Sequence, residues 1–437
     1  MKDNVKRFLG WAILVILALV PVVLLFTLGP EALEVQDYSS VTQMLGEVFG
    51  LVGMTLFALT FMLSTRIRFI EDIFGGLDKV YVVHGVLGGT ALMLILFHPI
   101  LLVLKFIPSN IKLAASYLLP SSYWSVNFGI IALTGLILLV GLTLYSKMKY
   151  HKWKLSHEFL GAIFILAVLH IFLVRGVASR DNIFSGYYLF AGIVSFIGLS
   201  AFSYSLFIKD RIMKNAVYII KRIEQKNDVF IIDMIPKHKP LEYQSGQFVY
   251  VRFYNERLSR EEHPFSIASK SNSRDLRIII KKLGDYTDRL EHLKIGDKVS
   301  IEGPYGKFNC DLQKKNEEQV WIAGGIGITP FLGMLEDLET CRVKVDLYHS
   351  VKKESDFINY KEMEDANSRI NQFRFIPWNS TNKGYLTVND ISKISGDLKK
   401  KTFYICGPEA FKNSIIKGLT DAGVDNNKIH EEVFGFR

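Results

Sequence analysis

Two apolar stretches of the chain each carry a pair of histidines, His84 with His98 and His157 with His170. The histidines of a pair are 14 residues apart in HGVLGGTALMLILFHPI and 13 apart in HEFLGAIFILAVLH. Ionisable residues at membrane depth are costly enough to need a partner or a task. Neutral imidazoles are the usual axial ligands of a haem iron, whereas a zinc ion would need about four ligands at one point. The spacing therefore favours haem over zinc.

The composition indicates a membrane protein. The chain has 437 residues, of which 49% are hydrophobic and 13% aromatic, so it is too apolar for an ordinary soluble enzyme and long enough for two or three domains. The formal net charge of +9 could suggest a nucleic acid partner. No basic run stands apart from the flanks of the apolar stretches, so we expect the lysines to set membrane topology and we expect no nucleic acid binding.

The three cysteines, Cys310, Cys341 and Cys406, all lie in the polar C-terminal half and share no close metal-ligand spacing. Such usage favours a reducing compartment without disulfides, which is the cytoplasm.

Six apolar stretches have the roughly 20 residues that a bilayer core requires. The first lacks a small-residue cleavage site, so we expect it to remain as a helix. Basic residues precede the first stretch and follow the second, fourth and sixth, whereas GPEALEVQD, after the first, is acidic. The positive-inside rule thus predicts a multi-pass protein of the cell membrane with both termini in the cytoplasm. The predicted spans are 8–28, 44–64, 80–104, 124–146, 157–175 and 187–208.

This topology makes the third and fifth spans parallel, so that His84 lies opposite His157 near the inner side and His98 opposite His170 near the outer side. The two levels are about 20 Å apart at 1.5 Å per residue. A spacing of 13 residues misses the same helix face by about 140°, so we expect the fifth span to be tilted, twisted or locally bulged. Glycines at 85, 88 and 89 would let a flat macrocycle approach the third span. Histidines that merely bond neighbouring helices are the alternative.

The histidine spacing on the third and fifth of six spans resembles the transmembrane domain of the NADPH oxidase and ferric reductase family. Beyond residue 216, short β-rich runs separated by turn residues predict an antiparallel barrel. HPFSIAS then resembles the flavin motif of the ferredoxin-NADP reductase superfamily. The resemblance implies that the segment of His263 and Pro264 contacts FAD, that Phe265 flanks the isoalloxazine, and that Ser266 approaches its N5 edge.

The segment IKKLGDYTDRL resembles the pyrophosphate segment of the same superfamily. It ends a strand at Gly284 and opens a helix whose backbone N–H groups can receive a diphosphate. Lys281 and Thr287 would complete this site, with lysine where many relatives carry arginine.

From residue 317 the pattern alternates between β and α, which predicts a doubly wound parallel sheet. AGGIGITPF places glycines between a strand and a helix, where bare backbone can approach a dinucleotide phosphate. With ICGPEAF about 80 residues later, the pair resembles the nicotinamide half of the superfamily. The resemblance implies cofactor binding by Gly325, Gly327, Thr329, Pro330, Cys406, Gly407 and Pro408. An ordinary buried thiol is the alternative for Cys406.

Near the C-terminus, HEEVFGFR places Phe434 where the superfamily has an aromatic ring over the flavin, with Glu432 two residues before it. Many relatives end at that aromatic residue, so Phe436 could be the stacking ring instead. By the resemblance Ser266, Cys406, Glu432 and Phe434 form the catalytic set.

A preference for NADPH over NADH is predicted from YHSVKKESDF, in the turn that meets the adenosine ribose in the superfamily. Ser350, Lys352 and Lys353 supply hydroxyl and ammonium groups for a 2′-phosphate. Lysine binds as a point charge, so the preference should be modest and NADH remains possible.

The resemblance implies that NADPH gives hydride to FAD in the cytoplasm and that electrons cross the membrane through two b-type haems to oxygen, giving superoxide. We see no calcium-binding loop and no long regulatory extension, so we expect a compact bacterial enzyme without an obligatory regulatory subunit. A ferric chelate, a quinone or an extracytoplasmic partner enzyme is the alternative acceptor. A further alternative for the function of the whole protein is a scaffold with degenerate sites. The expected domains are a six-helix transmembrane haem bundle (1–210), a β-barrel FAD domain (211–315) and an α/β NAD(P)H domain (316–437).

Overall fold

The computed structural model describes residues 2–28, 37–107, 110–174, 186–209, 216–309, 317–339 and 341–432. The chain divides into two compact units, which are described separately. One unit holds the helices of the first 210 residues, and the other holds the two sheets that follow. The expected domain boundaries at 210/211 and 315/316 fall outside the described residues.

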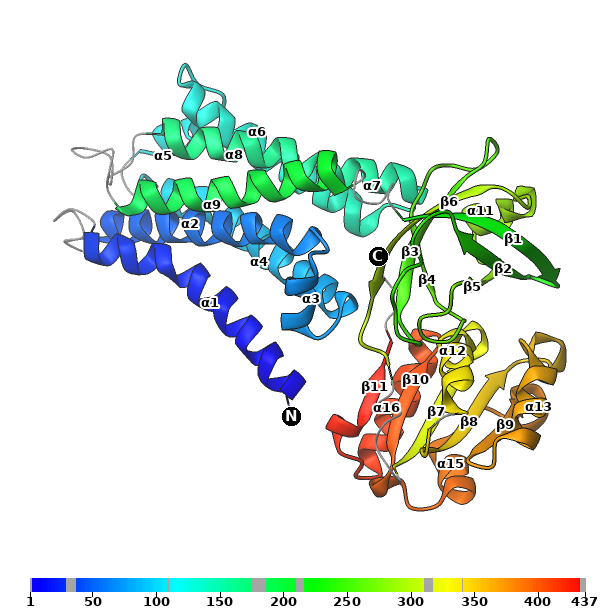
Figure 1. Cartoon of the computed structure of the whole chain (residues 1–437). Helices are drawn as coiled ribbons and strands as arrows, with labels where there is room; N and C mark the ends of the chain where they lie inside the picture. Colours follow the sequence, from blue (N-terminus) through cyan, green and yellow to red (C-terminus); the bar gives the residue numbers. More distant parts are fainter. Residues whose placement is uncertain are drawn as a thin grey trace. The chain divides into compact units, whose positions relative to one another are not determined.

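Within these described ranges, six helical stretches are long and apolar enough to cross a membrane, in agreement with the six predicted spans. They lie in α1 (Lys2–Leu28), α2 (Tyr38–Ser64), α4 (Leu77–Leu104), α6 (Trp124–Tyr145), the consecutive α7 (Tyr150–Glu158) and α8 (Leu160–Leu173), and α9 (Gly186–Ser203) with its π-helical end (Tyr204–Ile208). In α1 the stretch is Val5–Leu24, and in α9 with its π-helical end it is Tyr188–Ile208. Short helices α3 (Arg68–Phe74) and α5 (Ile111–Ser116) lie between them. Figure 1 shows the long helices running side by side.

Helix α2 is the most buried of the six long helices. Asp37 caps its start, accepting a hydrogen bond from the Ser40 backbone N–H at 2.8 Å, as expected for an aspartate at an N-cap. Phe57 and Phe61 of α2 both pack against Phe164 of α8, with ring centres 5.3 and 5.0 Å apart. This aromatic contact holds the histidine-bearing α8 against the centre of its unit.

The fifth span is interrupted at Phe159, between its two histidines. There the Phe159 carbonyl accepts from the N–H of Ala162, three residues later, at 3.0 Å and from that of Ile163, four residues later, at 3.2 Å, so the tighter 3-10 bond stands beside the α-helical one. Tighter turns rotate the chain further per residue, which is the direction that a 13-residue spacing needs to bring two side chains to one face. The predicted irregularity of this span is therefore confirmed, and its position is at Phe159.

The first sheet of the second unit has six antiparallel strands in the order β4-β3-β6-β1-β2-β5. One isolated bridge, between Ile267 and Ile278, links the segment after β4 to β5. The antiparallel sheet was predicted; its closure as a barrel stays a prediction. The strands are β1 (Val217–Lys226), β2 (Val229–Pro236), β3 (Phe248–Tyr254), β4 (His263–Ser266), β5 (Leu276–Lys281) and β6 (Lys298–Tyr305).

The second sheet has five parallel strands in the order β11-β10-β7-β8-β9. Side chains of α12 (Thr329–Leu338) and α13 (Tyr360–Arg369) share a core with one face, whereas those of α15 (Val388–Ser395) and α16 (Glu409–Asp421) share a core with the other. The predicted doubly wound arrangement is confirmed. The strands are β7 (Glu318–Gly324), β8 (Lys344–Val351), β9 (Phe373–Asn379), β10 (Thr402–Cys406) and β11 (Ile429–Glu431).

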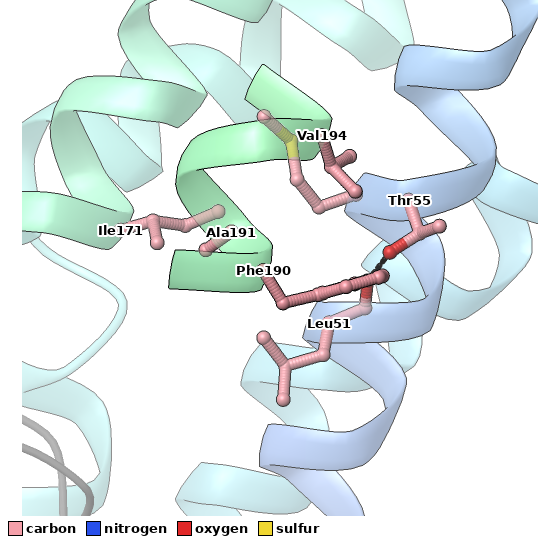
Figure 2. A pocket seen from close by; sticks show the side chains of 7 residues that line it. Leu51, Thr55, Ile171, Phe190, Ala191 and Val194 are labelled. Atoms are coloured by element: carbon pink, nitrogen blue, oxygen red, sulfur yellow. Dashed lines mark hydrogen bonds between the residues drawn. The ribbon is translucent and has the colours of Figure 1, made fainter. Parts of the chain in front are cut away.

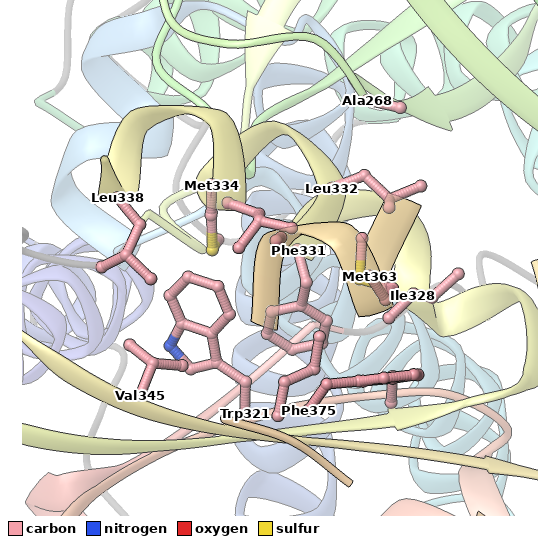
Figure 3. Packing of buried hydrophobic residues seen from close by; sticks show 14 of the residues in the cluster. Ala268, Trp321, Ile328, Phe331, Leu332, Met334, Leu338, Val345, Met363 and Phe375 are labelled. Carbon is pink, nitrogen blue, oxygen red and sulfur yellow. The ribbon is translucent and has the colours of Figure 1, made fainter. Parts of the chain in front are cut away.

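The cores of the two sheets are continuous. Trp321 of β7 stacks on Phe331 of α12 with ring centres 5.5 Å apart, and Figure 3 shows Met334 and Leu338 around them. The same apolar cluster includes Ile279 of the first sheet. A Cβ at Gly333 of α12 would lie 2.6 Å from the Ser269 carbonyl oxygen, so this glycine permits the close approach of α12 to the first sheet.

Candidate functional site: facing histidine pairs and a dinucleotide edge

The four membrane histidines form two facing pairs, as predicted. The ring centres of His84 and His157 are 6.0 Å apart, and those of His98 and His170 are 6.3 Å apart. Two imidazoles on opposite sides of one iron place their ring centres roughly 6 Å apart, from about 2 Å for each metal–nitrogen bond and about 1 Å from that nitrogen to its ring centre. Both separations fit one metal ion between two rings.

The outward nitrogen of each ring is engaged by the protein. His84 Nδ1 lies 3.0 Å from the Thr60 carbonyl oxygen, His98 Nδ1 lies 2.7 Å from that of Gly46, and His170 Nδ1 lies 2.7 Å from that of Ser125. A carbonyl only accepts, so each of these Nδ1 atoms carries the proton and leaves Nε2 as a bare ligand.

His157 is held differently from the other three histidines. Its Nδ1 lies 3.2 Å from Thr143 Oγ1, whose own proton goes to the Leu139 carbonyl at 2.8 Å. Trp153 stacks on the His157 ring with planes 8° apart, and its indole N–H donates to the Thr143 carbonyl at 3.1 Å. Thr143 therefore orients both the imidazole and the ring that covers it.

Two glycines that sequence reasoning missed make room for the outer pair. A Cβ at Gly50 would lie 2.6 Å from His98 Nδ1, and one at Gly129 would lie 2.8 Å from His170 Nδ1. The predicted glycines behave differently, because a Cβ at Gly85 or Gly89 would meet no atom within 4 Å. Gly50 and Gly129 thus fit the rings, while Gly85 and Gly89 border open space.

These residues fit a haem better than a structural metal ion. Within the described ranges, no three or more of the histidine, cysteine, aspartate and glutamate side chains come together as a metal site. Each level offers two imidazoles with Nδ1 engaged, which is the donor set for the two axial positions of a haem iron.

A small apolar pocket lies among α2, α8 and α9, and Figure 2 shows its lining. Two residues of its wall place it: Leu51 directly follows Gly50, which lies against His98, and Ile171 directly follows His170. The Thr55 hydroxyl, the polar side-chain group of the wall, already donates to the Leu51 carbonyl at 2.9 Å. The pocket therefore lies near the level of the outer pair and offers no charged group.

In the second unit, the HPFS motif forms strand β4, which pairs with β3. His263 lies against the Tyr286 ring at 3.9 Å between ring centres, and its Nε2 is 3.1 Å from Glu261 Oε2. Burial lowers the pKa of His263, although the Glu261 carboxylate acts in the opposite direction. Pro264 and Phe265 are half-buried, and they pair with Tyr250 and Val249 of β3.

The predicted diphosphate segment is only partly arranged as expected. The helix after Gly284, α11 (Asp285–Asp288), is a single short turn. The N–H groups of Leu283 and Gly284 both donate to Thr287 Oγ1, at 2.9 and 3.1 Å. Lys281 Nζ lies 3.2 Å from Asp228 Oδ2. In this structure Thr287 closes the turn and Lys281 is ion-paired, so binding a diphosphate would require both to exchange partners.

The glycine loop and the CGP motif meet at one edge of the parallel sheet. β7 and β10 are adjacent strands, although they are the first and fourth in the chain order of this sheet. Ligands of such sheets bind at this kind of switch point, beyond the carboxyl ends of the strands. A Cβ at Gly327 would lie 2.3 Å from the Cys406 carbonyl oxygen, so only glycine allows this approach.

Other predicted residues of this edge flank the same loops. Gly325 has φ +55° and Gly407 has φ +156°, both of which favour glycine. Thr329 and Pro330 are buried at the start of α12, and Thr329 Oγ1 donates to the Ile326 carbonyl at 3.1 Å. Pro408 precedes α16, and a Cβ at Gly324 would lie 3.0 Å from its ring.

Three members of the predicted catalytic set lie together. Cys406 is fully buried, and its Sγ lies 3.8 Å from Glu432 Oε2. Burial raises the pKa of the Glu432 carboxyl well above its usual range, while the Cys406 thiol acts in the opposite direction, as does the nearby Ser266 hydroxyl, which does not reach hydrogen-bond geometry. Burial likewise raises the pKa of the Cys406 thiol well above its usual range. Burial therefore disfavours the charged form of both groups.

Two polar atoms of this cluster are buried without a hydrogen-bond partner in the part of the chain that the structure describes: Ser266 Oγ and Glu432 Oε1. Buried polar groups are rarely left unpaired, so such atoms point to a missing ligand. Ser266 comes from the first sheet and Glu432 from the end of the second. This arrangement fits a flavin and a nicotinamide that meet between them.

Sequence reasoning missed the residue that anchors Glu432. Lys412 of α16 is buried, and its Nζ donates to Glu431 Oε2 at 2.9 Å and to the Glu432 carbonyl at 2.8 Å. In the sequence, the one indication of this role is that Lys412 lies on the same face of α16 as the apolar Ile415 and Leu419. Lys412 holds the chain just before the predicted stacking ring. Phe434 and Phe436 themselves lie outside the described residues.

The predicted 2′-phosphate residues lie at the end of β8 and in the turn that follows. Ser350 pairs with Gly324 of β7, so it is at the carboxyl edge beside the glycine loop. Lys352 and Lys353 are exposed. The Lys352 carbonyl accepts a hydrogen bond from Thr381 Oγ1 at 2.6 Å, which fixes the turn and leaves both ammonium groups at the surface.

Three family models match successive parts of the chain. A ferric reductase like transmembrane component matches residues 49–168, an FAD-binding domain matches 212–309, and an oxidoreductase NAD-binding domain matches 321–417. The glycine loop and Cys406 lie in the third match. Three of the four paired histidines, His84, His98 and His157, lie in the first match, and His170 lies two residues beyond its end.

Curated relatives resemble parts of the chain. Dual oxidase 1 of Caenorhabditis elegans is 30% identical over 260 residues, which are 54% of this chain and 16% of that protein. A flavohemoprotein of Rhizobium meliloti is 25% identical over 50% of this chain and 60% of its own length. The glycine betaine monooxygenase reductase subunit of Pseudomonas aeruginosa is 28% identical over 33% of this chain and 42% of its own length. The chain thus spans less than two thirds of each of these relatives.

Among solved structures, the flavohemoglobin of Malassezia yamatoensis with bound FAD and heme matches with a TM-score of 0.49 and 17% identity, over 81% of this chain and 98% of that chain. The FAD/NAD-binding domain of nitric oxide dioxygenase from Vibrio cholerae matches with a TM-score of 0.45 and 23% identity, over 50% of this chain and 98% of that chain.

Proposed function

We propose that this chain, which combines the ferric reductase-like transmembrane, FAD-binding and NAD-binding domains of the NADPH oxidase and ferric reductase-like family, transfers electrons from cytoplasmic NADPH across the cell membrane to oxygen. The product on the outer side would be superoxide. The observation that carries the proposal is that two facing histidine pairs lie at two levels of the helix unit. In each pair the distance between the ring centres fits one iron between the two imidazoles.

The flavin, when bound, accepts a hydride and releases its electrons one at a time, and the haems, when bound, carry single electrons. His84 with His157, and His98 with His170, would hold the two irons. Because both axial positions of each iron would be filled by protein, the acceptor should react at the edge of the outer haem rather than bind its iron.

The residues of the second unit support hydride transfer. Gly325 and Gly327 give backbone access at the switch point, and Cys406 borders the same edge. Because burial disfavours its charged form, the Glu432 carboxyl can hold a proton at Oε1 or Oε2 without placing a negative charge beside the flavin. Ser266 Oγ, which has no hydrogen-bond partner among the described side chains and backbone, can donate to the flavin's N5 edge.

The apolar pocket near the outer pair supports oxygen as the acceptor over an ionic chelate. Its wall consists of aliphatic and aromatic side chains and one threonine hydroxyl that is already engaged. A small neutral molecule would lose nothing by entering such a pocket, whereas an anion would lose its hydration without a compensating charge.

The test is turnover of the full chain in detergent or vesicles with NADPH, under air and without oxygen, with and without a ferric chelate. We expect NADPH oxidation under air together with cytochrome c reduction that superoxide dismutase suppresses. Turnover only with the chelate would instead make the protein a ferric reductase.

A slow reaction with oxygen that accelerates when an extracytoplasmic enzyme is added would identify an electron-relay subunit. The similarity to a monooxygenase reductase subunit is the reason to include this addition in the test. Absence of flavin and of haem absorption bands from the purified chain would favour a scaffold.

A further inference from the structure

A buried imidazole lies beneath the glycine loop of the second unit. His349 of β8 has no exposed surface, and its Nε2 lies 2.9 Å from the Gly325 carbonyl oxygen. A carbonyl oxygen accepts and never donates, so Nε2 carries the proton and Nδ1 does not. Nδ1 is buried and has no hydrogen-bond partner among the residues that the structure describes. The hydrogen bond to Gly325 is therefore what this side chain contributes.

Gly325 is the residue at which the chain leaves β7. It has φ +55°, in the left-handed region, and it opens the 3-10 turn Gly325–Ile328 that leads into α12. The register pairs Ala323 with His349, so the imidazole comes from the neighbouring strand and reaches along β7 to the turn. A glycine in this region has many alternative conformations, and the hydrogen bond from His349 selects one of them.

The opposite side of the loop is already fixed by contact. A Cβ at Gly327 would lie 2.3 Å from the Cys406 carbonyl oxygen, so this part of the loop lies directly on the end of β10. The His349 ring is itself held, because Phe357 contacts it edge-on with ring centres 5.2 Å apart. The loop is thus held by β10 on one side and by a ring of fixed orientation on the other.

We propose that His349 is a positioning residue, whose Nε2–H holds the Gly325 carbonyl and thereby fixes in advance the loop that receives the phosphates of a nicotinamide dinucleotide. The inference rests on the proposed function in one respect, that this loop binds such a nucleotide. A loop ordered before binding costs less entropy when the ligand arrives. Loss of the bond should therefore weaken nucleotide binding and change the rate at saturation little.

The test compares His349→Gln, His349→Asn and His349→Leu in the full chain. A glutamine amide can reach the position of Nε2 and donate, an asparagine amide reaches only the position of Nδ1, and leucine cannot donate. The exposed His238→Gln is the matched control. Binding of NADP⁺ and NAD⁺ is measured by calorimetry, which needs no electron transfer, and flavin reduction by NADPH is followed by stopped flow.

We expect about tenfold weaker nucleotide binding for His349→Leu and His349→Asn, with limiting flavin reduction within about twofold of wild type and with His349→Gln close to wild type. Equal affinity in all variants, or His349→Gln as weak as His349→Asn, would overturn the proposal. If His349→Leu does not fold, the two amide variants still decide. A wild type that binds neither nucleotide would contradict the proposed function instead.

Discussion

His98 and His170 face each other in the helix unit, at the level predicted to be the outer one, with their ring centres 6.3 Å apart. Both Nδ1 atoms are engaged by backbone carbonyls at 2.7 Å, so both rings present Nε2 to the space between them. His84 and His157 also face each other, although the Nδ1 of His157 contacts the Thr143 hydroxyl instead of a backbone carbonyl. The two facing pairs lead to the first prediction.

Replacing His98 or His170 with alanine should remove the outer haem and leave flavin reduction by NADPH largely unchanged, because hydride transfer belongs to the second unit. Haem content should fall from two to one per chain, and superoxide formation should stop. Haem is measured by its absorption after extraction, and flavin reduction by stopped flow. Replacing His84 or His157 should interrupt the inner step instead. A correctly folded His170→Ala protein that lost flavin reduction would count against the assigned electron path.

Glu432 should work as a neutral acid. Burial raises its pKa well above the usual range, so a neutral amide should replace it at neutral pH. We expect Glu432→Gln to keep flavin reduction within a few-fold of wild type, and Glu432→Ala to lose at least about tenfold by removing the contact with Cys406.

The same shift gives a pH dependence with a definite sign. A carboxyl whose pKa is raised in the folded protein ionises more easily in the unfolded chain, so stability falls as pH rises from the unfolded value toward the folded one. Glu432→Gln should remove this component of the decline, as measured by thermal unfolding from acidic to neutral pH. An unchanged pH profile in this variant would show that the carboxyl is already ionised.

His349 should give the opposite dependence. Burial lowers the pKa of His349 to about 4. Between about pH 6.5 and 4, this side chain is therefore protonated in the unfolded chain and unprotonated in the folded protein. Stability should therefore fall as pH decreases through this window, by up to about 3 kcal/mol. Thermal unfolding of wild type and His349→Gln over this range measures the difference, and parallel curves would contradict it.

Phe434 is predicted to cover the flavin until the nicotinamide displaces it. Phe434→Ala should then change hydride transfer or nicotinamide affinity more than Phe436→Ala does. Among the described residues, Lys412 anchors the chain at Glu432, two residues before Phe434 in the sequence. Steady-state constants and flavin reduction rates of both variants provide the measurement, and a larger effect of Phe436→Ala would reassign the stacking ring.

A modest preference for NADPH over NADH should depend on Lys352 and Lys353. Both side chains are exposed, so their attraction for a 2′-phosphate should weaken with added salt. In the double alanine variant, kcat/KM for NADPH should fall by several-fold while that for NADH stays near wild type. Steady-state constants with both nucleotides at low and high salt measure this. Equal values for the two nucleotides in wild type would refute the assignment.

The sequence alone determined the elements and most of the candidate residues. The six spans, the two histidine pairs and the change from antiparallel to parallel strands follow from hydropathy and periodicity, which depend on residues near one another in the chain. The resemblance placed Ser266, Cys406 and Glu432 in one site, and the structure brings these three residues together.

Only the tertiary structure decided what supports those residues. In the sequence, Gly50 and Gly129 are ordinary small residues of apolar helices. The structure shows that they lie against the rings of His98 and His170. His349 reads as a strand residue and Lys412 as a helix residue, because the carbonyls that they hold belong to residues 24 and 20 positions away. The break at Phe159 has no proline beside it, and Gly161, two residues later, did not by itself indicate the position of the break. Such contacts depend on how the chain folds between residues that are distant in the sequence, and local sequence patterns do not determine that.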